Sequence, residues 1–99
     1  MAVNKMDIPN NRFLAPGTWV RKDGRIIVGD GEEKHTEWGV VESCRLDETI
    51  GVYDCVIAFH ANTFSQPTPE IPYHLTYATA GLVEIDKADV PVMKNGVLE

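Results

Sequence analysis

The feature that most constrains the fold is a pair of apolar stretches joined by a short turn in the middle of the chain. Residues 52–60 place an apolar side chain at every second position, and residues 36–46 are rich in β-branched and aromatic residues. The connection, residues 47–51, is largely polar and ends in Gly51. Alternation with a period of two is typical of half-buried strands, and such a connection favours a tight turn. We therefore expect an antiparallel hairpin.

The register of this hairpin follows from the requirement that the apolar sides of the two strands meet. The pairs that satisfy it are Leu46 with Tyr53, Cys44 with Cys55 and Val40 with Phe59. Glu42 would then lie opposite Ile57 on the buried side. Two explanations stay open: a β-bulge near residues 39–41 turns Glu42 outward, or Glu42 is a partly buried carboxylate.

Weaker signals precede the hairpin. Residues 1–16 have no clear period and are interpreted as an arm, whose end Phe13 and Leu14 would anchor on the core. The elements expected after the arm are a strand over 18–22, a turn at Asp23-Gly24, an apolar run over 26–28 and a polar loop over 29–34.

The chain after the hairpin contains one long loop and two further strands. The expected elements are a loop with three prolines over 61–72, a strand over 73–77, one 3₁₀ turn over 78–81 and a last strand over 82–85. Residues 86–99 are weakly patterned and are interpreted as a tail. The sequence therefore predicts one mainly β domain over residues 17–85, a five-stranded, partly open barrel with irregular termini.

The chain is acidic, with nine Lys and Arg against fifteen Asp and Glu and a formal net charge of −6. This charge repels phosphate backbones and disfavours a nucleic-acid partner. Arg12, Arg21, Lys22 and Arg25 could form a local basic patch, but we interpret them as solubilising residues beside a hairpin.

The sequence also indicates a cellular location. It contains no apolar run of membrane-spanning length, and its first residues lack the apolar stretch of a signal peptide. Two cysteines are too few for a disulfide scaffold. We therefore expect a cytoplasmic protein without a membrane partner.

The order of elements resembles that of SH3-like barrels. The residues that carry the resemblance are 17–21 (Gly-Thr-Trp-Val-Arg), 38–41 (Trp-Gly-Val-Val), 53–59 and 82–85 (Leu-Val-Glu-Ile). The resemblance covers residues 17–85 and implies an SH3-like architecture. It says little about activity, because one fold hosts many functions.

A narrower similarity is to type II dihydrofolate reductase, a small SH3-like protein that acts as a tetramer around one central pore. It rests on residues 17–22, on Tyr77 and on residues 82–85. In that family a lysine near the first strand and a Gln-Ile-Tyr run line the pore. Lys22 and Tyr77 match the lysine and the tyrosine, whereas Leu75 and Thr76 occupy the Gln and Ile positions. The resemblance implies a homo-oligomer, but the amide that the family uses to hold its ligand is missing.

The two cysteines and the acidic residues between 30 and 42 could each form a functional site, but we interpret both groups as structural. Cys44 and Cys55 are either a redox or metal pair or two reduced core thiols, and we favour the thiols because a zinc site needs about four ligands. The acidic residues between 30 and 42 lack the spacing of a calcium loop and are interpreted as a solvated face. They are Asp30, Glu32, Glu33, Glu37 and Glu42.

The surplus of aromatic residues provides the ligand-binding candidates, because a barrel of this size cannot bury all of them. We select Lys22, Trp38, Phe64, Tyr73 and Tyr77, with Phe64 as the exposed ring of the proline-rich loop. Phe64 could instead cap an open end of the barrel. No catalytic residue, metal site or cofactor is expected.

Two functions are therefore carried forward. The first is a small non-enzymatic binding module that self-associates and takes a peptide or small-molecule ligand. The alternative is a small-ligand-binding protein or enzyme, similar to type II dihydrofolate reductase, with a site formed between subunits.

Overall fold

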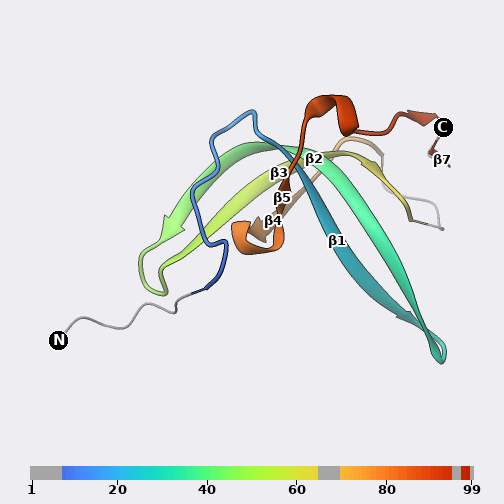
Figure 1. Ribbon diagram of the computed structural model, residues 1–99, viewed down its shortest axis with the longest axis horizontal. Helices are drawn as coiled ribbons and strands as arrows, with labels where there is room; N and C mark the ends of the chain where they lie inside the picture. The colour runs from blue at the N-terminus through green and yellow to red at the C-terminus, as the bar shows by residue number, and fades with distance from the viewer. Residues whose placement is uncertain (1–7, 65–69, 95–96, 99) are drawn as a thin grey trace.

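The computed structural model describes residues 8–64, 70–94 and 97–98 of the chain. These residues form one five-stranded antiparallel sheet in the order β4-β3-β2-β1-β5, so β4 and β5 are its two edge strands and the sheet is open (Figure 1). The strands are β1 (Trp19–Val28), β2 (Gly31–Asp47), β3 (Val52–Asn62), β4 (Tyr73–Ala78) and β5 (Val83–Glu84). The expected mainly β, five-stranded fold is confirmed.

The elements after β3 lie close to their expected positions. The strand over 73–77, the 3₁₀ turn over 78–81 and the strand over 82–85 are found as β4, η1 (Thr79–Gly81) and β5. The tail contains more structure than expected, a second 3₁₀ turn and a two-residue ladder. These are η2 (Lys87–Asp89), β6 (Met93–Lys94) and β7 (Val97–Leu98). None of the helices over the described ranges is long and apolar enough to cross a membrane.

The β2–β3 hairpin confirms part of the expected register. Leu46 pairs with Tyr53 and Cys44 pairs with Cys55. The expected pair of Val40 with Phe59 is wrong: Val40 lies opposite Ala58, and Phe59 lies opposite Gly39. The reason is an irregularity between Val41 and Ser43, where Glu42 is an extra residue in β2.

The extra residue decides between the two explanations for Glu42. Its carboxylate is turned outward and is about half exposed, and Oε1 lies 2.8 Å from His74 Nε2. The bulge is therefore the correct explanation, and Glu42 is not a buried carboxylate. A bulge absorbs one residue and allows the apolar side chains on both sides of it to face the core.

The turn expected at Asp23-Gly24 and the loop expected over 29–34 are wrong. β1 continues through Asp23-Gly24 to Val28, the turn lies at Gly29-Asp30, and β2 begins at Gly31. Gly29 takes the positive φ of +59° that such a turn requires. The result is a long two-stranded ribbon, residues 22–37, which projects from the rest of the molecule at the lower right of Figure 1.

Gly24 is a strand residue because of its cross-strand neighbour. It pairs with His35, and a Cβ atom on Gly24 would lie 2.5 Å from Cε1 of the His35 ring. The ring therefore lies directly over the glycine, an arrangement that compensates for the missing side chain. His35 is in turn stacked on Phe64 with 4.8 Å between the ring centroids.

The core lies on one face of the sheet, called here the core face. Its buried side chains come from all the long strands and from the segments that cover them. They are Leu14, Val20, Val41, Cys55, Ile57, Phe59 and Leu82. Leu14 and Leu82 show that the arm and the segment after η1 close this face, since both are only 3% exposed.

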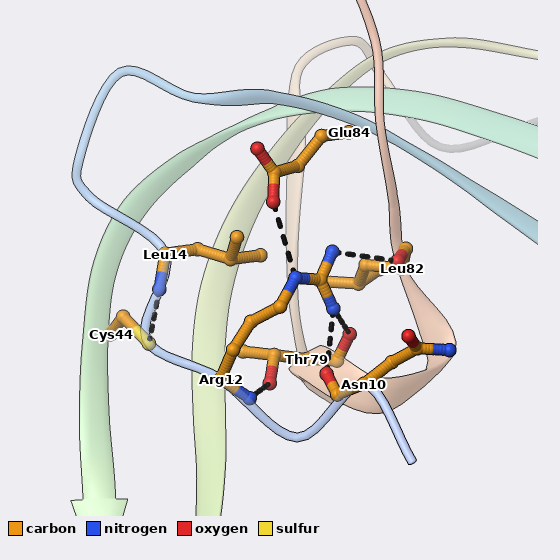
Figure 2. Close-up of polar contacts among 7 residues, drawn as sticks. All are labelled: Asn10, Arg12, Leu14, Cys44, Thr79, Leu82 and Glu84. Atoms are coloured by element: carbon orange, nitrogen blue, oxygen red, sulfur yellow. Dashed lines mark hydrogen bonds and ion pairs between the residues drawn. The ribbon is translucent and has the colours of Figure 1, made fainter.

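Arg12 fastens the arm to η1 (Figure 2). Its guanidinium donates hydrogen bonds to the carbonyl oxygens of Thr79 at 3.0 Å and Leu82 at 3.1 Å, and it pairs with Glu84 at 3.1 Å. The Arg12 backbone N–H also donates to Oγ1 of Thr79 at 3.1 Å. The expected anchoring is confirmed for Leu14, whereas Phe13 is 55% exposed. Residues 1–7 of the expected arm lie outside the described residues.

Candidate functional site

A buried carboxylate with polar partners lies where the ribbon joins the body of the sheet. Glu37, in β2, is 1% exposed and is among the largest fully buried side chains. Glu37, Gly39 and Val41 are alternate residues of β2, and all three are buried. Strand alternation therefore places Glu37 on the core face. Its cross-strand partners are Lys22 on β1 and Asn62 on β3.

Two tyrosines from the edge strand β4 complete this group. Tyr73 pairs with Phe59, and Tyr77 pairs with Cys55, so both rings lie on the core face. They flank the ring of Phe59, at centroid distances of 5.4 Å for Tyr73 and 5.8 Å for Tyr77. We call Lys22, Glu37, Asn62, Tyr73 and Tyr77 the tyrosine–carboxylate cluster.

Hydrogen bonds connect the members of the cluster. The Tyr73 hydroxyl donates to Oε1 of Glu37 at 2.8 Å, and the Tyr77 hydroxyl makes a longer contact of 3.5 Å to Oε2. Nδ2 of Asn62 donates to the Tyr73 hydroxyl at 3.2 Å. Lys22 places its ammonium nitrogen 4.4 Å from the centroid of the Tyr77 ring, a cation–π distance.

The electrostatics of the cluster keep both phenols protonated. Burial raises the pKa of Tyr73 well above its ordinary value. The hydrogen bond from Asn62 acts to lower this pKa, and the hydrogen bond to Glu37 acts to raise it. Burial and then the negative charge of Glu37 raise the pKa of Tyr77. The two hydroxyls are therefore neutral hydrogen-bond donors at physiological pH and are poorly suited to act as bases.

Three of the five predicted ligand-binding residues come together in this cluster: Lys22, Tyr73 and Tyr77. The other two do not. Trp38 follows Glu37 directly, so its side chain lies on the opposite face of the sheet. Phe64 is half-buried and stacks on the ring of His35, so it lies outside the cluster.

Glu37 and Asn62 were not among the predicted site residues. Glu37 was assigned to a solvated acidic face, and that assignment is wrong for this residue because it is buried. The expected register gave no signal for it, because that register places Val40, Cys44 and Leu46 on the buried side and Glu37 on the other side. The extra residue Glu42 reverses the alternation, and this brings Glu37 and Val41 onto the core face.

Cys44 and Cys55 lie directly opposite each other and are both free thiols. Burial, followed by the hydrogen bond and the charge of Cys44, raises the pKa of Cys55 to about 12. The backbone N–H of Leu14 donates to Sγ of Cys44 at 3.5 Å. Because the thiolate is the reactive form, a raised pKa makes Cys55 a poor nucleophile and favours the interpretation of a core thiol.

A hollow lies on the ribbon itself and has a volume of about 460 Å³. It is lined by Asp23, Gly24, Arg25, Lys34, His35 and Thr36. Nδ1 of His35 is buried and has no hydrogen-bond partner among the described residues. Over the same residues, no group of three or more His, Cys, Asp and Glu side chains is placed to hold a metal ion.

Comparison of the chain with known proteins finds no matching family model, no matching curated protein and no matching solved structure. The proposals below therefore rest on the geometry of this chain.

Proposed function

We propose that this protein is a small non-enzymatic binding module that self-associates. The observation that carries the proposal is the projecting ribbon, on which Ile26 and Ile27 are 41% and 82% exposed to solvent. A two-stranded ribbon is only marginally stable when it stands alone, so a partner that covers it would stabilise it. A second copy of the chain is a partner that is always present.

The test is the molecular mass in solution as a function of protein concentration, measured by sedimentation velocity. We expect the wild-type mass to increase with concentration, and Ile27→Thr to shift this increase to higher concentration because it removes apolar area while keeping a β-branched residue. Ile50→Thr is the matched control, since Ile50 is 54% exposed but lies in the β2–β3 turn. A monomer at every concentration would overturn the proposal.

A second candidate function is a small-ligand-binding protein or enzyme whose site forms between subunits, as in type II dihydrofolate reductase. One observation favours it: Lys22 and Tyr77, which match that family, lie in contact at the root of the ribbon. A partner on the ribbon would approach the same residues. Pterins and nicotinamide nucleotides should then raise the melting temperature of the wild type, with a smaller increase for Lys22→Met. Equal melting temperatures with and without these compounds would remove this candidate.

We further propose that the sheet is an SH3-like barrel that stays open. Support comes from the order of the elements, in which a 3₁₀ turn separates β4 from a short last strand that returns to pair with β1. The long ribbon accounts for the difference from a closed barrel, because β1 and β2 extend beyond the part of the sheet that β5 covers.

A further inference from the structure

We propose that a second copy of this chain adds to the sheet along the outer edge of β1, antiparallel, with a twofold axis at Gly24. The outer edge is the side of β1 that faces away from β2, over residues 22–28. This inference rests on the proposed self-association and specifies its surface and register.

The outer edge of β1 is an unpaired strand edge for most of its length. β5 pairs with β1 only at Val20 and Arg21, and no other described strand pairs with β1 on this side. From Lys22 to Val28 the edge therefore presents backbone donors and acceptors that another strand can use. Figure 1 shows this part of β1 running along the projecting ribbon, away from the arm and from η1.

The backbone parity of this edge is fixed by the contact with β5. The N–H of Ile85 donates to the carbonyl oxygen of Trp19 at 3.0 Å, so Trp19 directs its backbone groups towards the outer edge. In a strand, every second residue does the same. On the unpaired part of the edge, Asp23, Arg25 and Ile27 are therefore the residues whose N–H and C=O groups point outward.

Parity and charge together favour one register. In an isologous antiparallel pair, outward-pointing residues must face outward-pointing residues, so the twofold axis lies at a residue position. An axis at Asp23 places two aspartates opposite each other, and an axis at Arg25 does the same with two arginines. An axis at Gly24 places Asp23 opposite the partner's Arg25 and Arg25 opposite the partner's Asp23. Opposite charges in directly facing positions are favourable, and like charges are not.

The distribution of charge over the molecule favours the same surface. Residues 21–36 contain four basic and four acidic residues, so this part of the chain is neutral and the remainder carries the whole net charge of −6. Two copies that meet through their ribbons keep their acidic bodies apart. Within one chain, Asp23 pairs with Arg21 at 3.2 Å and Arg25 pairs with Glu32 at 3.3 Å. Both ion pairs are exposed, so they are easily exchanged for pairs with a second chain.

The register also gives the partner a place beside the tyrosine–carboxylate cluster. With the axis at Gly24, Lys22 lies opposite the partner's Ile26. Lys22 already covers the Tyr77 ring, so the partner's Ile26 would lie beside this cluster. The same pairing would therefore bring the cluster to the boundary between two subunits.

Charge exchange tests the register. Asp23→Lys alone and Arg25→Glu alone each place like charges opposite each other twice, and we expect each to raise the dimer dissociation constant by about tenfold. Mixing the two variants should restore the wild-type constant, because every facing pair of the heterodimer is again of opposite charge. The double variant Asp23→Lys, Arg25→Glu should restore it within one chain. Sedimentation velocity at low salt measures all four samples.

A pair of proline variants tests the edge. Arg25→Pro removes an N–H that points to the outer edge and that the register uses, whereas β1–β2 pairing does not need it. Ile27→Pro is the matched control, because its N–H also points outward but lies opposite the partner's Arg21, which β5 already occupies. We expect Arg25→Pro to weaken the dimer by tenfold or more and Ile27→Pro to weaken it less.

The outcomes separate this inference from the proposed function. A wild-type protein that stays monomeric overturns both. A wild-type dimer that responds equally to both proline variants, or whose charge variants fail to complement each other when mixed, overturns the Gly24 register and leaves self-association standing. Circular dichroism of each variant identifies any that fails to fold, and the complementation of the two exposed charge variants then decides the matter.

Discussion

At the scale of single residues, Glu37 shows how a charge is accommodated in the core of this protein. A buried carboxylate is costly unless hydrogen bonds replace the water that it has lost. Tyr73 and Tyr77 supply hydroxyl donors, and Asn62 holds the Tyr73 hydroxyl from the other side. The carboxylate thus links β2 to the edge strand β4 across β3.

The Glu37 charge should be visible in the titration of the two tyrosines. After burial, the charge of Glu37 is a cause of the raised pKa of Tyr77, and its hydrogen bond and charge contribute at Tyr73. Glu37→Gln keeps an acceptor oxygen and removes the charge, so we expect both phenols to titrate at lower pH than in the wild type. The tyrosinate absorbance of the folded protein measures this change. Glu42→Gln, an exposed carboxylate elsewhere in β2, is the control and should leave the titration unchanged.

Gly24 should be intolerant of a side chain only while His35 covers it. A Cβ atom there would lie 2.5 Å from Cε1 and 2.7 Å from Nε2 of His35, so the ring must leave its stack with Phe64. We expect Gly24→Ala to lower the free energy of unfolding by about 1 kcal/mol. In the His35→Ala background the same change should raise it by about 0.5 kcal/mol, because alanine is the better strand residue. Urea unfolding of the wild type, the two single variants and the double variant gives a double-mutant cycle. If the effects of the two substitutions on the free energy of unfolding were additive, the contact between Gly24 and His35 would be contradicted.

At the scale of elements, the sequence predicted what depends on local alternation and failed where a distant contact decides. The alternation of β3 placed Tyr53 and Cys55 correctly, and the misfit of Glu42 indicated the bulge that the structure contains. Asp23-Gly24 is a strong turn signal, but the ring of His35, eleven positions away, converts it into a strand. Nothing local to residues 23–24 encodes that contact.

The arm is another element that the sequence described only by its lack of pattern. Arg12 holds it by two carbonyl oxygens and one carboxylate (Figure 2), a fork that lysine cannot reproduce. We expect Arg12→Lys to lower the free energy of unfolding by about 2 kcal/mol and to accelerate amide exchange at Leu14. Arg21→Lys, which alters an exposed pair with Asp23, is the control and should have almost no effect. Unchanged exchange at Leu14 would show that the arm is held by its apolar contacts alone.

At the scale of the whole molecule, the site was predictable only in part. Lys22, Tyr73 and Tyr77 were selected one by one, and strand pairing brought them onto one face of the sheet. Glu37, which joins them, was hidden among other acidic residues because composition does not show which face of a strand a charge occupies. The projecting ribbon was hidden together with the turn, because β1 continues through Asp23-Gly24 to Val28, where the local sequence indicated a turn.

The fold as a whole should lose stability in alkali, and Cys55 should act first. Burial and then the Cys44 hydrogen bond raise the pKa of Cys55 from 9.0 to about 12, and burial raises the pKa of Tyr73 from 10.0. A pKa that is higher in the folded state gives a stabilisation that is complete below the unfolded pKa and is lost as the pH rises towards the folded pKa. From pH 9 upward the thiol therefore favours the unfolded chain.

We expect the free energy of unfolding to decrease above pH 9 with a slope of up to about 1.4 kcal/mol per pH unit from this thiol. Cys55→Val removes the thiol and should flatten the decrease between the ordinary pKa values of cysteine and tyrosine, 9.0 and 10.0. Tyr73→Phe should alter the profile only above the upper of these values, so it serves as the internal comparison. Urea unfolding at closely spaced pH values provides the measurement. If Cys55→Val and the wild type had the same slope in this interval, the buried thiol would not be the group whose ionisation first destabilises the sheet.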